Sequence, residues 1–398
     1  MKVVVAHNQY SSAQPSGENA VVDAEIALLA GAGVEVVPFL RSSDEIATLP
    51  LAQKALLPLS PVYAPTAQRE LRALVRRERP DVLHLHNPYP LLSPWVVRTA
   101  HAEGVPVVQT VHNFRHVCAS GVYFRDGHPC HDCLGKAVPF PAVQHACYRG
   151  SRAQSAVMAA TLTAHRGTWR SVQRYLALTP ALAGHLRSFG ITDDQIAVKP
   201  NSAPDPGEHS QVGEGLLFVG RLTEEKGLDL LLDAWRRYPE GSLGTLRIAG
   251  DGPMRDAVGV VAASRTDVRF LGRVDAAARD AAMRASAALV VPSVWDDICP
   301  MVVVEALANA RPVLATDKGG LPFLVGAGEP EPAGWVVEPT VDAFAAVLPR
   351  VVAEAPSLAA LARRRYLDAF TPALNTERLL AVYRQLATSQ ATRAGREA

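Results

Sequence analysis

The sequence predicts an α/β protein built from two domains, each a parallel, doubly wound sheet covered by helices. Three observations support this prediction. The chain has 398 residues, which is too long for one ordinary domain and suits two of about 200. Short β-branched runs alternate with longer helical patterns along the whole length, as expected for parallel sheets with crossover helices. A stretch rich in Pro and Gly interrupts this alternation near the middle of the chain.

Each half of the chain carries six strand candidates, recognised as short apolar runs rich in β-branched residues. Those of the first half are Lys2–His7, Glu35–Phe39, Asp81–His86, Val105–Val111, Tyr175–Leu178 and Ala197–Lys199. Those of the second half are Leu216–Val219, Thr245–Ala249, Val268–Leu271, Ala288–Val291, Val313–Ala315 and Trp335–Val337. Helical patterns between them include Asn19–Ala30, Thr66–Glu78, Leu228–Arg237 and Met301–Asn309.

The break in the alternation, Pro200–Gly215, contains three prolines and three glycines and reads as a linker. We therefore expect an N-terminal domain over residues 1–200, a linker over 201–215 and a C-terminal domain over 216–375. Residues 376–398 should form a helix, Thr376–Leu386, that crosses back to the first domain, and then a frayed polar tail. Two Rossmann-like domains that face each other would bind ligands at the carboxyl ends of both sheets.

Charge and composition exclude several classes of protein. Lys plus Arg number 40 and Asp plus Glu 39, so the net charge of +1 argues against a general nucleic-acid binder. Residues 1–200 nevertheless carry a net +5 and residues 201–398 a net −4. No uninterrupted apolar run reaches the roughly 18 residues that span a bilayer. The N-terminus reads as a buried strand and not as a signal peptide, so we expect a cytoplasmic protein.

A first phosphate-binding pattern, Gly220-Arg221-Leu222-Thr223-Glu224-Glu225-Lys226-Gly227, directly follows the first strand of the second domain. A turn that opens onto a helix N-terminus offers unpaired backbone N–H groups to an anion. Arg221 and Lys226 would add a guanidinium fork and a point charge for a diphosphate. The alternative is that both are solvated turn residues, although Lys226 is one of only six lysines in the chain.

A second pattern runs from Pro292 to Glu305, where a strand ends, a loop carries two acids and a helix begins near Met301. The N-terminal amides of this helix again favour phosphate. Asp297 and Glu305 together suit hydroxyl recognition, because ionised carboxylates accept hydrogen bonds from OH groups. For the neighbouring Asp296, a helix cap is an equally good interpretation.

The first domain offers polar groups at the ends of its strands. The loop Pro15-Ser16-Gly17-Glu18-Asn19 could approach a bound ligand or its phosphate, or Ser16 could simply cap the following helix. His84 and His86 alternate along one strand and so share one face. Either one of them reaches the cleft, or both are satisfied structural histidines. His112 ends the next strand.

Four of the five cysteines, Cys118, Cys130, Cys133 and Cys147, fall within 30 residues in the spacing C-x11-C-x2-C-x13-C. Four thiolates can hold a structural zinc ion, and a cytoplasmic chain favours metal over disulfides. Disulfides or redox pairs, or simple packing, are the alternatives. Spare ligands nearby are His116, His128, His131 and His145. The sequence thus predicts a possible structural zinc.

The two phosphate-binding patterns resemble those of glycosyltransferase family 4, whose members have the GT-B fold of two facing Rossmann-like domains. The cysteine segment is similar to that of a bacterial subgroup of this family. Further motifs that fit are Ile248-Ala249-Gly250-Asp251-Gly252-Pro253, Phe270-Leu271-Gly272-Arg273-Val274, Ala310-Arg311-Pro312-Val313-Leu314-Ala315-Thr316 and Gly319-Gly320-Leu321-Pro322. The resemblance implies a retaining glycosyltransferase that moves a sugar from a nucleotide-diphosphate sugar to a hydroxyl acceptor, with no cofactor required for catalysis.

The resemblance also implies roles for individual residues. Arg221 and Lys226 bind the donor diphosphate, Glu305 binds the ribose hydroxyls, and Asp297 contacts hydroxyls of the donor sugar. His112 is the cleft histidine near the reacting centre. The expected catalytic residues are His112, Arg221, Lys226, Asp297 and Glu305. The expected donor-binding residues are Gly17, Gly220, Arg221, Lys226, Gly272, Arg273, Val274, Asp297, Cys299, Pro300, Met301, Val302 and Glu305.

The chain departs from the family pattern at two positions. The family usually has Glu where this chain has Asp297, and it tends to have an acid where Phe323 stands. These departures keep open a non-catalytic nucleotide-sugar-binding module, and a GT-B epimerase is a further alternative. A dinucleotide-dependent oxidoreductase is disfavoured, because Gly250-Asp251-Gly252 gives only half of the G-x-G-x-x-G fingerprint.

The expected partners are a nucleotide-diphosphate sugar and an acceptor that is a sugar, a lipid-linked molecule or a small hydroxyl compound, but not a nucleic acid. The acceptor would belong to cell-envelope, exopolysaccharide or glycolipid assembly. The basic stretches Arg69–Arg79 and Arg149–Arg174 could face an anionic lipid surface at the inner face of the membrane, or they are solvated helix faces.

Overall fold

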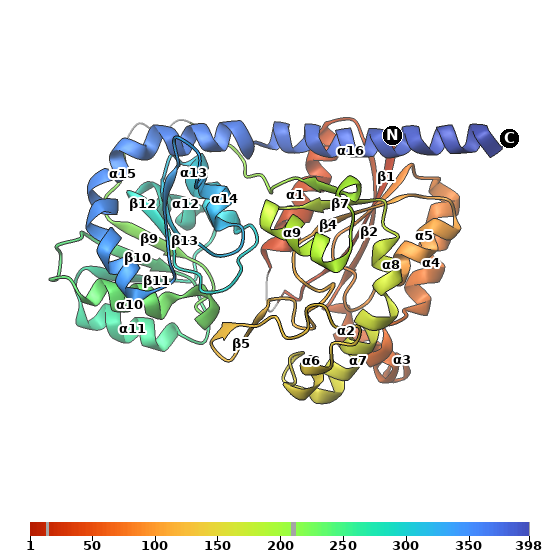
Figure 1. Cartoon of the computed structure of the whole chain (residues 1–398), viewed down its shortest axis with the longest axis horizontal. Helices are drawn as coiled ribbons and strands as arrows, with labels where there is room; N and C mark the ends of the chain where they lie inside the picture. The colour runs from red at the N-terminus through yellow and green to blue at the C-terminus, as the bar shows by residue number, and fades with distance from the viewer. Residues whose placement is uncertain (13–15, 208–211, 398) are drawn as a thin grey trace. The chain divides into compact units, whose positions relative to one another are not determined.

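The computed structural model describes residues 1–12, 16–207 and 212–397 (Figure 1). Pro15 of the first-domain loop, residues 208–211 of the expected linker and Ala398 lie outside the described residues. The chain divides into two compact units, which we treat separately. The first unit comprises Met1–Tyr123, His131–Lys199 and Ala373–Ala398, and the second comprises Phe124–Cys130 and Pro200–Pro372.

The first unit is built on a six-stranded sheet in the order β2-β1-β3-β4-β7-β8, and all its neighbouring strands are parallel. The strands are β1 (Lys2–Gln9), β2 (Glu35–Ser42), β3 (Val82–Leu85), β4 (Val107–Val111), β7 (Arg174–Ala177) and β8 (Ile196–Val198). The strand order reverses between β1 and β3. In open parallel sheets such a switch point leaves a crevice at the carboxyl ends of the strands, where ligands bind.

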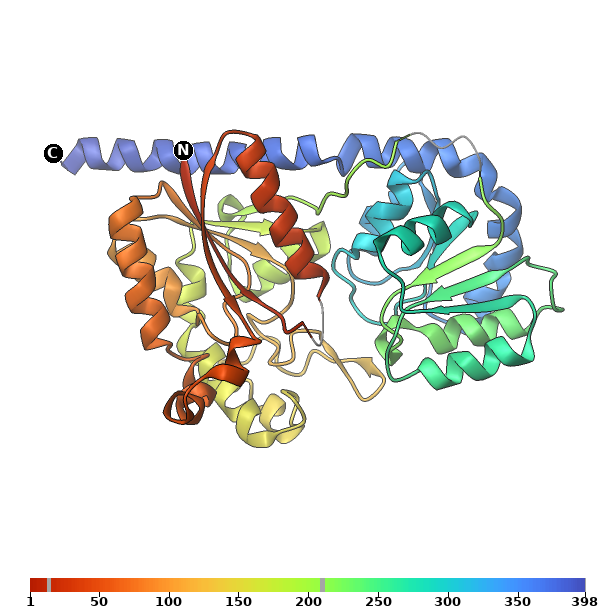
Figure 2. The ribbon, with the colours of Figure 1, turned by 180° about the vertical axis from the view of Figure 1, so that it is seen from behind.

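Helices cover this sheet, and α1 packs on β1 and β2 (Figure 2). The Ser16 side chain accepts a hydrogen bond from the Glu18 N–H and caps α1, so the expected capping role is confirmed. The helices of this unit before α16 are α1 (Gly17–Gly31), α2 (Glu45–Thr48), α3 (Leu51–Leu56), η1 (Leu57–Leu59), α4 (Pro65–Glu78), α5 (Trp95–Ala102), α6 (Phe140–Gln144), α7 (Arg152–Ala164), α8 (Arg166–Arg170), α9 (Pro180–Phe189) and η2 (Asp193–Gln195).

The C-terminal helix α16 (Pro372–Glu397) supplies part of the core of the first unit. Leu379, Val382, Tyr383 and Leu386 are buried there together with residues of β1, α1 and β3. The expected frayed tail after Thr388 is wrong, because the helix continues to Glu397. Alanine and arginine, both good helix formers, recur in that stretch. Their helix propensity is a signal that apolar periodicity does not contain.

The second unit carries a parallel sheet in the order β11-β10-β9-β12-β13-β14, the strand order of a Rossmann fold. Its strands are β9 (Leu216–Val219), β10 (Leu246–Ala249), β11 (Val268–Gly272), β12 (Ala288–Val291), β13 (Val313–Thr316) and β14 (Gly334–Val337). Its helices are η3 (Glu224–Lys226), α10 (Leu228–Arg236), α11 (Arg255–Ser264), α12 (Ala276–Arg284), α13 (Met301–Ala308), α14 (Leu321–Val325) and α15 (Val341–Ala369). The switch point lies between β9 and β12.

Among the described residues, one helical stretch, Val341–Thr388, is long and apolar enough by length and composition to cross a membrane. Phe344, Leu348 and Val351 of α15 are fully buried in the core of the second unit. Because 28% of the most apolar 18-residue window of this stretch is buried, packing inside the protein accounts for part of its apolar character. The sequence analysis counted only uninterrupted apolar runs and did not single out this stretch.

All twelve expected strands are present, each within three residues of the expected bounds. The sequence analysis missed the short hairpin of β5 (Phe124–Arg125) and β6 (His128–Pro129). It also missed the length of α15, which runs through Pro349 and Pro356. A proline inside a helix removes one hydrogen bond, and here the buried apolar face of α15 offsets that loss.

Candidate functional site

In the second unit, the loops that follow β9 and β12 pack against each other at the switch point. Gly227 has a positive φ of 68°, and a Cβ atom at this position would collide with the carbonyl oxygen of Pro292. The Val294 N–H donates to the carbonyl of Glu225 at 3.0 Å. Only glycine can adopt this positive φ and also leave room for the Pro292 carbonyl, so Gly227 allows the two loops to come into contact.

This contact brings Lys226 and Asp297 together. The Lys226 ammonium lies 2.5 Å from Oδ2 of Asp297, and the Ser293 hydroxyl donates to the same oxygen at 3.1 Å. The ammonium also lies 5.2 Å from the centre of the Trp295 ring. The Asp297 side chain is 7% exposed and that of Lys226 is 17% exposed. Two residues expected in separate motifs therefore form one partly buried ion pair.

Arg221 precedes Lys226 in the same loop. Its side chain lies on the surface and is 62% exposed. Its guanidinium contacts the Glu225 carboxylate at 3.1 Å. Exposed ion pairs of this kind contribute little to stability, so the guanidinium can turn toward an arriving anion at small cost.

The loop that carries Asp297 is held in place by the motif after β13. The Gly320 N–H donates to the Asp297 carbonyl at 2.7 Å. Gly319 has a φ of 56°, and a Cβ there would collide with the backbone of Asp296 and Asp297. The Thr316 hydroxyl donates to the Ser293 carbonyl at 2.6 Å. The two glycines thus position the acidic loop.

Helix α13 begins directly after the acidic loop. Cys299 is buried, and Pro300, Met301 and Val302 at the start of the helix are half-buried. Glu305, one turn further on, lies 3.0 Å from the guanidinium of Arg279 on α12. Burial raises the pKa of Glu305, and Arg279 opposes this shift. Arg279 as the partner of Glu305 was not expected from the sequence.

The remaining expected donor residues lie at the carboxyl ends of β9 and β11, on the same edge of the sheet. The Gly220 N–H donates to the carbonyl of Ala249 at 3.1 Å, and the Gly250 N–H donates to that of Gly272 at 2.8 Å. Gly272 has a positive φ of 65°. Arg273 is exposed and Val274 is half-buried.

In the first unit, His112 lines a small hollow at the carboxyl ends of β3 and β4. Its Nε2 lies 3.0 Å from Nδ1 of His86, and the two rings are nearly parallel, at 24°. Burial, reinforced by His86 and His7, holds the pKa of His112 well below its usual value. His112 is therefore neutral at physiological pH. Glu18, Tyr89 and Arg115 also line this hollow.

Behind His86 lies a buried charge network that sequence reasoning missed. The Lys199 ammonium lies 2.8 Å from Oε2 of Glu25 on α1. Oε1 of Glu25 lies 3.2 Å from Nδ1 of His84 and 3.3 Å from Nε2 of His86. One signal was available, because Glu25 stands on the apolar stripe of α1 between Val22 and Leu29. An acid in such a stripe requires a buried cation.

Both strand histidines therefore belong to the network, whereas the sequence left open whether one of them reaches the cleft. His84 is hydrogen-bonded at both ring nitrogens, to Thr110 at 2.8 Å and to Tyr383 of α16 at 2.6 Å. His86 instead joins Glu25 to His112. Burial, with the neighbouring His84, lowers the pKa of His86 to about 4.

Glu18 lies at the start of α1 and lines the same hollow as His112. Burial raises its pKa to about 7, although Arg115 and Tyr10 lower it. A Cβ added at the preceding Gly17 would meet no atom of the described residues within 4 Å. Helix packing therefore does not explain a glycine at position 17.

The four clustered cysteines are not brought together as metal ligands. Among the described residues, the only group of three or more His, Cys, Asp and Glu side chains within ligand distance is Glu25, His84 and His86. The Lys199 cation already neutralises Glu25 there, which disfavours a metal ion. All five cysteines are described, and none is in a disulfide.

The contacts of individual thiols explain this outcome for the expected zinc ligands Cys118, Cys130, Cys133 and Cys147. Cys118 Sγ lies 3.2 Å from the Ser120 hydroxyl, and Cys133 Sγ lies 4.0 Å from the Pro139 carbonyl. Among the described residues these thiols are not grouped around one point, so a zinc ion would have to gather them into a four-thiolate site.

Comparison with known sequences now assigns the family. The family model described as "Glycosyl transferase 4-like domain" matches residues 16–202, and the model "Glycosyl transferases group 1" matches residues 213–354. The chain belongs to the family 4 type of glycosyltransferases. The two matches fall on the first and second units, and the second contains the Lys226–Asp297 pair.

Curated relatives of this glycosyltransferase include a phosphatidyl-myo-inositol mannosyltransferase of Mycobacterium leprae. It is 28% identical over 251 residues, which cover 60% of this chain and 55% of the relative. An uncharacterised glycosyltransferase of Methanocaldococcus jannaschii is 33% identical over 176 residues, 42% of this chain and 38% of the relative. The chain thus spans roughly half the length of the curated relatives it matches.

Solved structures agree on the fold. Sucrose-phosphate synthase from Thermosynechococcus elongatus has a TM-score of 0.70 at 20% identity, covering 98% of this chain and 100% of the other. Anabaena HepE in complex with UDP has a TM-score of 0.65 at 15% identity, covering 97% and 100%. At such identities the likeness shows the fold alone, and it confirms the GT-B prediction.

Proposed function

We propose that this protein is a retaining glycosyltransferase that moves a sugar from a nucleotide-diphosphate sugar to a hydroxyl acceptor. The observation that carries the proposal is the Lys226–Asp297 pair at the switch point of a Rossmann-order sheet. One cation for a diphosphate and one acid for sugar hydroxyls stand side by side at the position where such sheets bind ligands. Complexes of the structural neighbour HepE with UDP and with UDP-glucose support a nucleotide-sugar donor.

In this proposal the second unit stabilises the leaving nucleoside diphosphate. Lys226, Arg221 and the N-terminal amides of α13 would balance the charge that develops on the diphosphate as the bond to the sugar breaks. Asp297 would hold hydroxyls of the donor sugar and Glu305 those of the ribose. The resemblance implies front-face attack with retention, in which the leaving phosphate helps to take the acceptor proton. His112, being neutral, would position a sugar hydroxyl and would not act as a strong base.

The test is donor hydrolysis and transfer with a panel of UDP-, GDP- and ADP-sugars. Replacing Arg221 and Lys226 together by Ala should lower kcat/KM at least 100-fold, a loss of about 3 kcal/mol in transition-state stabilisation. Arg236, which is half exposed and pairs with Asp233 on α10, provides the control as R236A. An undiminished rate in the double variant would overturn the assignment. Isomerisation of the nucleotide sugar without acceptor would indicate an epimerase, and binding without turnover a non-catalytic module.

We further propose that the acceptor is lipid-linked and that the first unit docks on the inner face of the membrane. The phosphatidyl-myo-inositol mannosyltransferase relatives carry a phospholipid in their names, which suggests this acceptor class. The arginines of α4 do not carry the idea, because Arg72 and Arg76 pair with Glu103. The solvated-face interpretation therefore holds for those two residues of the stretch Arg69–Arg79.

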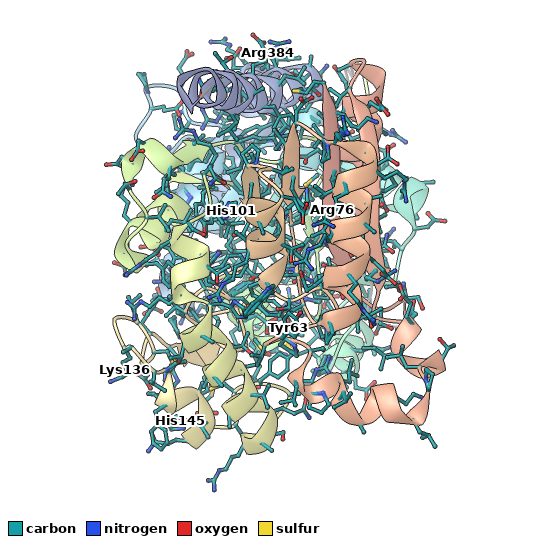
Figure 3. The ribbon with its side chains drawn as sticks, turned by 90° about the vertical axis from the view of Figure 1, so that its right-hand side faces the viewer. Tyr63, Arg76, His101, Lys136, His145 and Arg384 are labelled. Carbon is teal, nitrogen blue, oxygen red and sulfur yellow. The ribbon has the colours of Figure 1, made fainter. Side chains whose placement is uncertain are left out.

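A different surface, which we call the apolar tip, supports the membrane proposal. It consists of residues 51–63, with α3 and η1, and residues 134–152, with α6; η1 and α6 both pack against α7. Leu51 is 85% exposed, Leu56 65% and Phe140 58%. Figure 3 shows Lys136 and His145 of the tip at the end of the unit opposite Arg384 of α16. Exposed cations of the tip are Lys54, Lys136, Arg149 and Arg152. Exposed apolar side chains together with exposed cations suit an anionic lipid surface.

A structural zinc ion on the cysteine segment stays a prediction. Elemental analysis of the purified protein tests it, with ~1 zinc per chain expected if the four thiolates close around a metal. A protein without zinc and with four titratable thiols would end the proposal.

A further inference from the structure

A chain of buried polar groups leads from the back of the first sheet to His112. It begins at Lys199, at the end of β8, and passes through Glu25 of α1 and His86 after β3. His86 then meets His112, with 3.0 Å between Nδ1 of His86 and Nε2 of His112. Glu25, His86 and Lys199 are each at most 5% exposed, so water does not compete for these contacts. Among these buried groups, only His112 has a role in the proposed transfer reaction.

We call the contacts from Glu25 through His86 to His112 the relay, and Glu25 carries its negative charge. Burial alone would raise its pKa, but Lys199 and His84 outweigh burial and hold the pKa well below the usual value. The carboxylate is therefore ionised and can only accept hydrogen bonds. Its Oε1 and Nε2 of His86 make no aligned hydrogen bond, yet the two atoms lie 3.3 Å apart. A bare ring nitrogen at this distance would place a lone pair against a negative oxygen, so the proton of His86 belongs on Nε2.

The tautomer of His86 then decides that of His112. With its proton on Nε2, neutral His86 has only a lone pair at Nδ1, and Nδ1 must accept a hydrogen bond. The partner at 3.0 Å, Nε2 of His112, must therefore be the donor. A neutral His112 that carries its proton on Nε2 has an unprotonated Nδ1. That nitrogen is the one left to accept a hydrogen bond from a ligand in the hollow that His112 lines.

We propose that Glu25 and His86 are positioning residues that hold His112 in its Nε2–H tautomer, so that Nδ1 accepts a hydrogen bond from a substrate hydroxyl. The substrate part of this statement rests on the proposed transferase function, and the tautomer part rests on the described contacts alone. Similar outer partners fix the ring orientation of functional histidines in many enzymes, and their loss typically costs about 10- to 100-fold in activity or affinity.

The test is ¹⁵N NMR of the full chain labelled at histidine, which separates the two neutral tautomers through their ring-nitrogen shifts. The variant H112N assigns the His112 signals. We expect a single Nε2–H tautomer in the wild type. In E25Q the amide can present either a carbonyl or an N–H to His86, so a second tautomer of His112 should appear. Because E25Q leaves Lys199 unpaired, E25Q/K199M removes both charges and keeps the question answerable if E25Q folds poorly.

A matched control removes a buried histidine outside the relay. His165 is 1% exposed and its Nε2 pairs with the carbonyl of Val62, so H165Q tests the loss of a buried ring alone. H165Q should leave the His112 tautomer unchanged. In E25Q and E25Q/K199M, kcat with the nucleotide-sugar donor should fall about 10- to 100-fold while H165Q retains more.

The outcomes separate the two parts of the proposal. An Nδ1–H tautomer of His112 in the wild type, or the same single tautomer in all variants, would overturn the relay. A tautomer change in E25Q together with unchanged kcat would overturn the substrate hydrogen bond. If the wild-type protein transfers no sugar at all, the proposed function fails, and the tautomer result still decides whether Glu25 and His86 position His112.

Discussion

At the scale of single residues, the ion pair of Lys226 and Asp297 makes a testable statement about the donor site. Asp297 holds the Lys226 ammonium at 2.5 Å, so a bound diphosphate must compete with this carboxylate for the same cation. Replacing Asp297 by Asn removes the competing charge and keeps the shape and one acceptor oxygen. We expect D297N to bind a free nucleoside diphosphate several-fold more tightly by calorimetry. Its turnover of nucleotide sugar should fall, because the sugar hydroxyls lose a charged acceptor.

The neighbouring Asp296 supplies the control, since D296N removes one negative charge from the same loop and keeps both members of the Lys226–Asp297 pair. Equal tightening in D296N and D297N would mean that general charge repulsion acts, and not the ion pair. Weaker diphosphate binding in D297N would contradict the competition outright.

Glu18 gives a prediction about pH. Its pKa is raised to about 7 by burial, whereas an unfolded glutamate titrates near 4.5. Between these values the unfolded chain loses a proton that the folded chain keeps, so Glu18 makes folding less favourable as pH rises through this range. E18Q removes the effect. Its free energy of unfolding relative to wild type should therefore increase from pH 4 to pH 8, by on the order of 2 kcal/mol.

Urea unfolding followed by circular dichroism at several pH values measures this difference. E35Q removes a glutamate whose side chain is 65% exposed and serves as the control for charge loss in the same unit. A difference in the free energy of unfolding between E18Q and wild type that is constant with pH, or that decreases toward pH 8, would refute a buried Glu18 carboxyl.

The sequence indicated Lys226 and Asp297 separately, because motif spacing places them after two strands. Their direct contact depends on Gly227 and Pro292, which lie 65 positions apart, and local pattern says nothing about such pairs. Glu25 and Lys199 were missed for the same reason. A buried acid on α1 gains meaning only when the end of β8 brings a cation to it, and that is a tertiary contact.

At the scale of elements, the helix α16 tests whether the C-terminus is part of the first unit. The Tyr383 hydroxyl lies 2.6 Å from Nδ1 of buried His84, and Leu379 is 1% exposed. Y383F should lower the free energy of unfolding by about 1–2 kcal/mol, because a buried nitrogen loses its partner. L379A should cost more, about 2–4 kcal/mol, through the cavity it leaves.

R384A changes an exposed residue next to buried Tyr383 and should leave stability unchanged within about 0.5 kcal/mol. Thermal or urea unfolding of the full chain provides the measurement. If L379A were as stable as R384A, α16 would not contribute to the core of the first unit.

Elements were predicted unevenly for physical reasons. The twelve strands are short and most of them are buried, and β-branched runs bounded by turns mark them clearly. Long helices with small or polar faces leave a weaker pattern. α15 continues through Pro349 and Pro356 because Phe344, Leu348 and Val351 bury their side chains, a gain that a local rule against proline cannot register.

At the scale of the whole molecule, the overall charge of +1 conceals a basic N-terminal half of +5 and an acidic C-terminal half of −4. Several arginines of the basic half are paired within their unit, as Arg76 is with Glu103. The apolar tip instead contains exposed cations as well as exposed apolar side chains such as Leu51 and Phe140. Under the proposed membrane docking, these cations would give part of the excess charge a function.

The last prediction tests the tip with lipid vesicles. The full-length protein should co-sediment with vesicles that contain anionic phospholipid, and less with neutral vesicles, since each cation near an anionic surface contributes about 1 kcal/mol. Replacing Leu56 and Phe140 by Ser should weaken the partition at least about 10-fold, because both side chains would leave the lipid for water. Raising the salt concentration should weaken binding of the wild type as the charges are screened. The matched control is V260S/L367S, which removes two exposed apolar side chains, 69% and 45% exposed, from the second unit. Equal losses in both double variants, or binding that ignores lipid charge and salt, would refute the tip as the docking surface while leaving the Lys226–Asp297 site untouched.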